Sequence, residues 1–319
     1  MKKANQIKKV TCIGGGLIGS SWAIQFAMGG CDVTILIRRN HDKIRDQIQA
    51  SLDSLVALEA ISKEDSDRIF SSIHLTTDIS ESMSDADFVQ ENGPERLDVK
   101  QDLLAKAEEI LPEDAIYASS TSGLLISDIT RNAVHPERCI GAHPYNPPHL
   151  IPLVELTKSP SCTDETLALA KEFYLLIGKE PVILNKECKG FISNRLQMAI
   201  YREMTDLVAR GVCSLEDIDR ALLYGPGIRW AAFGHNMILQ LGSANGIAGM
   251  FDLLGDTIND WMADMANWTT MDPDWGAFAQ QEVNKEMTNL PSFMGNTTEE
   301  CRAFRDKVLI EILKLHHKL

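Results

Sequence analysis

The residues best suited to chemistry in this sequence are His143 and Glu155, which lie twelve positions apart. A Pro-rich stretch over residues 144–152 separates them, and such a stretch reverses the chain direction. The reversal can bring the carboxylate beside the imidazole. A histidine that a carboxylate orients and makes more basic can take the proton of an alcohol while hydride leaves the carbon. The pair therefore predicts a general base.

A glycine-rich turn near the start of the chain predicts the binding of a dinucleotide. Gly14, Gly16 and Gly19 form the pattern G-x-G-x-x-G directly after a β-rich run. Glycine at these positions permits a tight turn, close approach of a pyrophosphate and close packing of helix on sheet. Leu17 and Ile18 open the helix, whose N–H groups and dipole would face the phosphates. The alternative is a glycine-rich turn in another kind of α/β protein.

The next β-rich run bears on the choice between NAD and NADP. NAD-binding proteins usually end this strand in Asp or Glu, which accepts the ribose hydroxyls. This chain has Ile37 there, followed by Arg38 and Arg39. Isoleucine accepts no hydrogen bond, whereas Arg38 can pair with a 2′-phosphate. The local chemistry favours NADP, and the alternative is a solvated basic turn.

The elements that must position these residues alternate between strand and helix. A βαβ unit over residues 8–40 and a helical pair over 41–70 precede further strands and helices. Strands are expected at Ile73–Leu75, Phe88–Gln90, Ile116–Ser119, Cys139–Ala142 and Val182–Leu184. From about residue 187 only helical patterns follow. We therefore expect an α/β fold, a Rossmann-type doubly wound sheet in residues 1–186 followed by an all-α C-terminal domain in 187–319.

Composition narrows the function classes. The chain has 31 Lys and Arg against 45 Asp and Glu, a net charge of −14, so no overall basic field would attract nucleic acid or an anionic membrane. No apolar run is long enough to span a bilayer, and the amino terminus lacks signal-peptide features. The seven cysteines are scattered and form no CxxC pair. We expect a cytoplasmic protein without a metal site.

The segment Ser119–Leu156 resembles the 3-hydroxyacyl-CoA dehydrogenase family, whose pattern is a glycine loop, S-x-T-S, H-x-x-N-P and L-V-E. This chain has SSTSG, HPYNP and LVEL at the corresponding places, and the resemblance extends over essentially its whole length. It implies that His143 is the general base and that Glu155 orients it. It also implies that Ser122 and, in GFISNRL, Asn194 contact the substrate.

The same resemblance implies further contacts with cofactor and substrate. Asn146 in HPYNP matches a residue near the nicotinamide, and Glu95 and Lys100 in PERLDVK match cofactor and substrate contacts. The resemblance to the family implies NAD as the cofactor, whereas the local chemistry at Arg38 favours NADP. The residue after Ser122 is glycine, where acyl-CoA enzymes often carry a second serine.

Within the family, HP-x-NPP-x-x-IPLVEL and GPGIRWA resemble the branch that contains L-gulonate 3-dehydrogenase (lambda-crystallin) and carnitine dehydrogenase. These enzymes oxidise small polar 3-hydroxy acids. Arg229 would then hold a free carboxylate through two parallel hydrogen bonds, and the alternative is an ion pair at a helix start. Trp261, Trp268 and Trp275 could line a pocket or a subunit interface.

These observations predict an NAD- or NADP-dependent dehydrogenase that converts a small 3-hydroxy acid to the 3-oxo acid. One alternative is a short-chain 3-hydroxyacyl-CoA dehydrogenase, which would need a pantetheine channel. An alternative of another class is a non-catalytic dinucleotide-binding protein, which would have no chemical reason to keep His143 with Glu155. By resemblance the protein is expected to be a homodimer with a small-molecule substrate.

Overall fold

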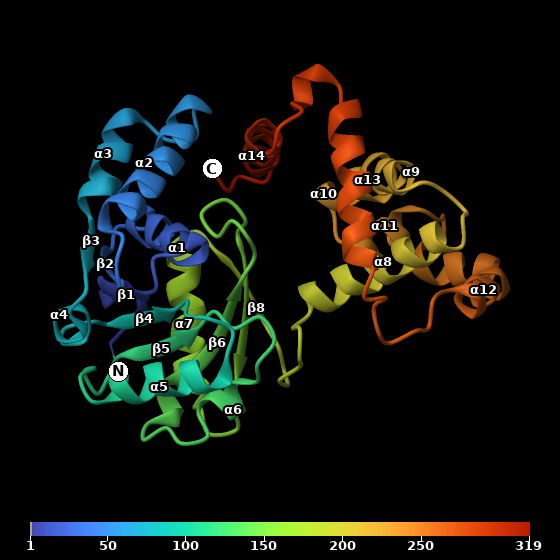
Figure 1. Cartoon of the computed structure of the whole chain (residues 1–319). Helices are drawn as coiled ribbons and strands as arrows, with labels where there is room; N and C mark the ends of the chain where they lie inside the picture. The colour runs from blue at the N-terminus through green and yellow to red at the C-terminus, as the bar shows by residue number, and fades with distance from the viewer. Residues whose placement is uncertain (1) are drawn as a thin grey trace. The chain divides into compact units, whose positions relative to one another are not determined.

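An eight-stranded sheet forms the centre of the first part of the chain in the computed structural model, which describes residues 2–319 (Figure 1). Its strand order is β3-β2-β1-β4-β5-β6-β7-β8. Neighbouring strands are parallel except β6 and β7, which are antiparallel. The strands are β1 (Lys9–Ile13), β2 (Asp32–Leu36), β3 (Ile73–Thr76), β4 (Phe88–Glu91), β5 (Ile116–Ser119), β6 (Cys139–Pro144), β7 (Leu153–Lys158) and β8 (Glu180–Ile183).

Helices cover both faces of this sheet. Successive residues of a strand point to opposite faces, and accordingly Phe88 and Val89 belong to two different hydrophobic clusters. One cluster includes residues of α1, α2 and α7, and the other includes residues of α4, α5 and α6. The helices are α1 (Leu17–Met28), α2 (His41–Ala57), α3 (Lys63–Ser71), α4 (Ile79–Met83), α5 (Leu97–Glu108), α6 (Ile126–Ile129) and α7 (Asp164–Leu176), with short turns η1 (Ala4–Gln6) and η2 (Pro136–Arg138). The expected doubly wound Rossmann-type sheet is confirmed.

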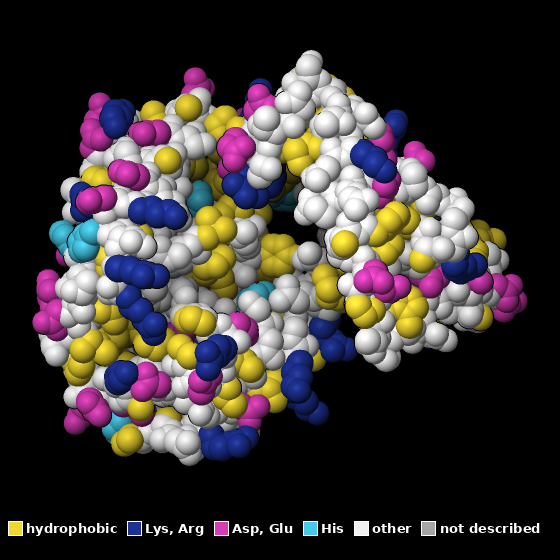
Figure 2. Space-filling view, in the orientation of Figure 1, with side chains coloured by type: hydrophobic (Ala, Val, Ile, Leu, Met, Phe, Trp, Pro, Cys, Tyr) yellow, Lys and Arg dark blue, Asp and Glu magenta, His cyan; other side chains and the backbone are white. Residues whose placement is uncertain are grey.

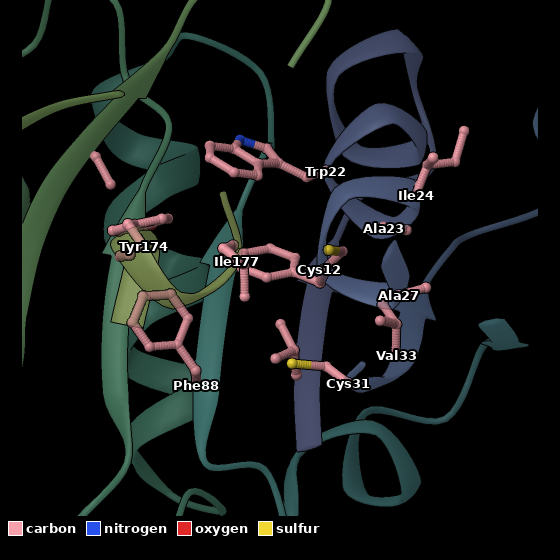
Figure 3. Packing of buried hydrophobic residues seen from close by; sticks show 14 of the residues in the cluster. Cys12, Trp22, Ala23, Ile24, Ala27, Cys31, Val33, Phe88, Tyr174 and Ile177 are labelled. Carbon is pink, nitrogen blue, oxygen red and sulfur yellow. The ribbon is translucent and has the colours of Figure 1, made fainter. Parts of the chain in front are cut away.

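Aromatic side chains fill the larger cluster (Figure 3). Trp22 of α1 stacks on Phe26 with ring centroids 5.1 Å apart, and Phe26 stacks on Phe173 of α7 at 5.8 Å. Phe88 of β4 meets Tyr174 edge to face at 5.6 Å. All five rings are at most 1% exposed, so they fix α1 and α7 against the same face of the sheet.

The rest of the chain is helical, as expected. Its elements are α8 (Ser193–Ala209), α9 (Leu215–Leu222), the π-helical turn η3 (Leu223–Gly227), α10 (Ile228–Ala232), α11 (His235–Leu241), α12 (Gly246–Asp264), α13 (Trp275–Asn289), the turn η4 (Ser292–Met294) and α14 (Thr298–Leu315). The chain divides into a first unit, which runs to Arg195 and resumes at Asp306–Leu319, and a second unit, Leu196–Arg305. The end of α14 belongs to the first unit because Ile310 is 1% exposed and joins its core.

The run that returns to Glu155 is a strand of its own, β7, which was not among the expected strands. The first unit includes the chain to Arg195 and also Asp306–Leu319. These residues are amphipathic like those before them, and the sequence pattern alone does not show which core they join.

The tryptophans of the second unit have separate surroundings. Trp268 Nε1 donates to Asp206, and Trp275 Nε1 donates to the hydroxyl of Tyr201, so both pack against α8. Trp261 on α12 is 58% exposed, and other apolar side chains of that helix are exposed as well. Figure 2 shows hydrophobic side chains interspersed with acidic and basic ones on the visible face of each unit.

Within residues 2–319 no single helix is long and apolar enough to cross a membrane. Two helices joined by a bend, His235–Leu241 and Gly246–Asp264, are together long and apolar enough by length and composition alone. Among these residues no three His, Cys, Asp or Glu side chains gather as a metal site would require.

A buried lysine secures the reversal that leads from His143 to Glu155. Lys179 is 1% exposed, and its Nζ donates to the carbonyl oxygens of Pro148 at 2.7 Å and Ile151 at 2.5 Å. Lys179 Nζ also lies 5.0 Å from the ring centre of Trp22. Burial lowers the pKa of Lys179 to about 7.

This lysine should make stability depend on pH. Between pH 7 and 9.5 the unfolded chain keeps a proton on Lys179 that the folded chain has released, so rising pH disfavours unfolding. Relative to Lys179→Met, the free energy of unfolding of the wild type should rise by about 3 kcal/mol across this window. Denaturant titrations at both pH values measure it. Lys171→Met, on the exposed side of α7, is the control and should follow the wild type; a Lys179→Met curve parallel to the wild type would contradict the prediction.

Candidate active site

The antiparallel pairing of β6 and β7 places His143 directly opposite Glu155. Directly opposed residues project from the same face of a sheet, so the reversal between them brings the two side chains together. His143 Nδ1 lies 2.8 Å from Glu155 Oε2. Both side chains are buried, and the contact predicted from their spacing is present.

The start of α8 completes the surroundings of this pair. Asn194 Nδ2 lies 3.4 Å from His143 Nε2, so the structure brings this predicted residue to the imidazole. Phe191, with φ of +50°, stacks on the imidazole at a centroid distance of 4.8 Å. The backbone N–H groups of Ile192 and Ser193 donate to Glu155 Oε1 at 2.8 and 2.9 Å. The segment GFISN therefore holds both members of the pair.

The same contacts decide the charge of Glu155. Burial would raise the pKa of this carboxyl, but hydrogen bonds from His143, Ser193 and Ile192 outweigh burial and lower the pKa. Glu155 is consequently ionised at neutral pH. An ionised acceptor at Nδ1 stabilises a protonated imidazole, which a general base becomes after it accepts a proton.

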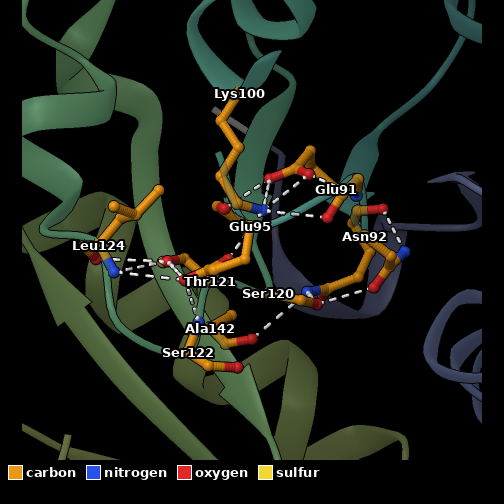
Figure 4. Close-up of polar contacts among 12 residues, drawn as sticks. Glu91, Asn92, Glu95, Lys100, Ser120, Thr121, Ser122, Leu124 and Ala142 are labelled. Carbon is orange, nitrogen blue, oxygen red and sulfur yellow. Dashed lines mark hydrogen bonds and ion pairs between the residues drawn. The ribbon is translucent and has the colours of Figure 1, made fainter. Parts of the chain in front are cut away.

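The loop that carries Ser122 is held by the carboxylate of Glu95 (Figure 4). Glu95 Oε1 accepts from Thr121 Oγ1 at 2.6 Å and from the N–H groups of Ser122 at 2.9 Å and Gly123 at 2.8 Å. Burial raises the pKa of Glu95, but these bonds, with the charge of Lys100, lower it overall. Ser122 itself is exposed. Glu95 therefore fixes the loop and leaves the Ser122 hydroxyl on the surface.

Lys100 lies behind Glu95 in a buried ion pair (Figure 4). Its Nζ is 3.0 Å from both carboxylate oxygens of Glu91, and neither side chain is more than 1% exposed. Glu91 also accepts from Ser119 Oγ at 2.5 Å. Glu91 was not among the predicted residues. It ends a buried strand, which places it at the edge of the sheet where the other site residues lie.

The glycine loop opens a cavity of about 730 Å³ at the carboxyl ends of β1, β2 and β4. The strand order reverses between β1 and β4, and such a switch point is where open α/β sheets bind dinucleotides. Gly14 has φ of +95°, and a Cβ at Gly19 would lie 1.9 Å from the carbonyl oxygen of Gly14. Both positions thus require glycine. Gly16 precedes α1, whose first residues are Leu17 and Ile18.

Basic side chains line the same cavity beyond the second strand. Arg38 is among them, as expected, together with Arg39 and Lys43, and Lys43 was not anticipated. Ile37 is 4% exposed, and its Cγ2 would lie 2.9 Å from a Cβ at Gly15. The side chain at the strand end therefore faces the glycine loop and offers no carboxylate. The cavity fits a dinucleotide through its backbone N–H groups, its glycines and these cations.

Two further predicted residues are exposed. Asn146 is exposed at the start of the reversal, before the cis peptide bond to Pro147. Arg229 is exposed on α10 of the second unit.

The fold and the site define a nicotinamide-dependent dehydrogenase, an oxidoreductase that acts on CH–OH groups. Residues 9–188 match the NAD binding domain of 3-hydroxyacyl-CoA dehydrogenase, and residues 190–301 match the C-terminal domain of the same enzyme. The chain belongs to the 3-hydroxyacyl-CoA dehydrogenase family.

Similar proteins agree with this assignment. The chain is 32% identical to L-carnitine dehydrogenase of Streptomyces coelicolor over all of its own length and 98% of that protein. It is 34% identical to 3-hydroxyacyl-CoA dehydrogenase of Gibberella moniliformis, over 98% of this chain and 96% of that one. A solved structure of 5-formyl-3-hydroxy-2-methylpyridine 4-carboxylic acid 5-dehydrogenase, an NAD+-dependent dismutase, superposes with a TM-score of 0.80 at 27% identity, over 97% of this chain and 98% of that chain.

Proposed function

We propose that this enzyme oxidises the 3-hydroxyl of a small polar 3-hydroxy acid, such as L-gulonate or carnitine, to the 3-oxo acid. The observation that carries the proposal is the buried contact of 2.8 Å between His143 Nδ1 and Glu155 Oε2. An ionised Glu155 accepts a hydrogen bond from the N–H at Nδ1 and so leaves the lone pair on Nε2. His143 Nε2 then takes the hydroxyl proton of the substrate.

Neighbouring residues orient the substrate in this mechanism. Asn194, whose amide lies beside His143 Nε2, and Ser122, on the loop that Glu95 holds, donate hydrogen bonds to the reacting oxygen. Gly14, Gly16 and the start of α1 would hold the nicotinamide cofactor, which would supply the hydride acceptor. Asn146 would lie at the nicotinamide end of the cofactor.

Loss of the base should slow the chemistry and spare cofactor binding. His143→Ala should lower kcat by about a hundredfold or more, the usual range for removal of a general base. The dissociation constant of the cofactor, measured by fluorescence of the reduced form, should stay within about twofold. His135→Ala, an exposed histidine, is the control and should keep full turnover. Near-normal turnover of His143→Ala would refute the assignment.

The relatives and the type of residue at Arg229 support the proposed substrate class. L-carnitine and the pyridine carboxylic acid named for the similar structure are both small acids. Arg229 binds such a free carboxylate with two parallel hydrogen bonds. A second candidate is a short 3-hydroxyacyl-CoA thioester, since the similar fungal protein is named for that activity.

A substrate panel separates the two candidates. L-gulonate, carnitine, 3-hydroxybutyrate and 3-hydroxybutyryl-CoA are compared by absorbance of the reduced nicotinamide. We expect a free acid to have a kcat/KM at least tenfold above that of the thioester, about 1.4 kcal/mol of transition-state preference. Equal rates on the thioester and the acids would remove the reason to place a carboxylate at Arg229.

We further propose that the enzyme accepts NADP at least as well as NAD. Ile37 offers no carboxylate that would repel a 2′-phosphate, and three cations, Arg38, Arg39 and Lys43, line the cavity beside it. Charge-assisted hydrogen bonds from these side chains would hold that phosphate.

The cofactor proposal has a selective test. Arg38→Ala should raise the KM for NADP by about tenfold, because a charge-assisted hydrogen bond is lost, and leave the KM for NAD nearly unchanged. Arg45→Ala is the matched control, since its guanidinium stacks on Phe70 outside the cavity lining. A wild-type preference for NAD above roughly tenfold in kcat/KM would contradict the proposal.

The enzyme is also proposed to be a homodimer. The apolar side chains of Phe251, Leu253, Trp261 and Met262 on α12 are each more than half exposed, which supports an interface on the second unit. Light scattering in solution would show twice the mass of the chain if the proposal holds, and the mass of one chain if it does not.

A further inference from the structure

The carboxylate of Glu155 accepts two different kinds of hydrogen bond on its two oxygens. Oε1 takes the backbone N–H groups of Ile192 and Ser193, whereas Oε2 takes His143 Nδ1 and the hydroxyl of Ser193. The hydroxyl contact is 2.5 Å, shorter than the 2.8 Å contact to the imidazole. Ser193 and His143 therefore share one oxygen of one carboxylate.

We propose that Ser193 is a positioning residue that limits the basicity of His143 by sharing the Oε2 oxygen of Glu155. The inference rests on the proposed role of His143 as the general base. A hydroxyl that donates to a carboxylate oxygen draws electron density from it and stabilises the ionised form. Less negative charge then remains on that oxygen to stabilise a protonated imidazole. The Ser193 hydroxyl contacts Glu155 Oε2 and acts on His143 through that carboxylate.

A purely structural role for the hydroxyl is the competing explanation. Ser193 opens α8, and the N–H groups at the start of a helix need acceptors. Glu155 Oε1 already accepts from backbone N–H groups at this helix start, including the N–H of Ser193. The Ser193 hydroxyl instead reaches Oε2, which is the oxygen that holds His143.

The neighbours of this pair include two apolar side chains and one titratable group. Val182 on β8 is its apolar strand partner, and Phe191 covers the imidazole. Tyr145, on the reversal, is a titratable group that interacts electrostatically with Glu155. Burial raises the pKa of Tyr145, and the charge of Glu155 raises it further. Tyr145 is thus neutral over the range in which an imidazole titrates. The serine hydroxyl is the side-chain donor that competes with His143 on Oε2.

Removal of the Ser193 hydroxyl should move the pH dependence of activity in one direction. In Ser193→Ala the full charge of Oε2 acts on the imidazole, so His143 holds its proton to a higher pH. Because alcohol oxidation needs the unprotonated base, the acid limb of kcat/KM against pH should move up by roughly half a pH unit. Ser193→Thr keeps a hydroxyl and should restore the wild-type midpoint.

The experiment measures that midpoint in two ways. Selective 13C labelling of histidine, with His143→Gln to assign the signal, follows the titration of His143 by NMR without any substrate. The pH profile of kcat/KM with the best hydroxy acid gives the kinetic midpoint. Ser62→Ala, which removes the N-terminal cap of α3 in the same unit, controls for the loss of a helix-terminal hydroxyl and should leave both midpoints unchanged.

Each outcome decides one question. An upward shift of both midpoints in Ser193→Ala, reversed in Ser193→Thr, supports the inference. A uniform loss of activity with unmoved midpoints means that Ser193 only stabilises α8 and overturns it. If the NMR midpoint moves while His143→Ala keeps near-normal turnover, the proposed base is wrong although the coupling between the two side chains is real.

Discussion

The buried charge of Glu155 is the constraint on which the site depends. An ionised carboxylate away from water is costly unless several donors surround it, and this one has four. Two of its donors are backbone groups at the start of α8, and one is the imidazole on the neighbouring strand. To satisfy this single side chain, the chain must bring together β6, β7 and the start of α8. His143 is aligned because its imidazole is one of the donors that Glu155 requires.

A second buried charge organises the other half of the site in the same way. Glu91 and Lys100 neutralise each other at the end of β4, and Lys100 also lies 3.5 Å from Glu95. Glu95 in turn binds three consecutive N–H groups after Thr121, those of Ser122, Gly123 and Leu124. Both loops at this edge are therefore held by carboxylates that accept from backbone. This rigidity is what a site needs in order to orient a substrate before reaction.

Much of the fold was predictable because its signals are local. The alternation of strand and helix gave the Rossmann-type sheet, and Gly14, Gly16 and Gly19 marked its switch point. The contact of His143 with Glu155 followed from the length and proline content of the reversal. Ser193 and Lys43 could not be singled out, since a serine at a helix start and a lysine on a surface helix are common. Ser193 contacts Glu155, and Lys43 lines the same cavity as the glycine loop, so each is placed beside residues that are far away in sequence.

The return of the chain to its first unit affects the order in which the protein can be completed during synthesis. Ile310 belongs to the same buried cluster as Trp22 and Phe26, yet the whole second unit, Leu196–Arg305, is made in between. At ribosomal rates those residues take roughly 6 to 20 s to add. For that time the nascent Rossmann unit has every strand of its sheet but not the helix end that closes its core. The apolar surface that α14 will cover stays open to chaperones, or to another nascent chain, until the residues of α14 have left the ribosome.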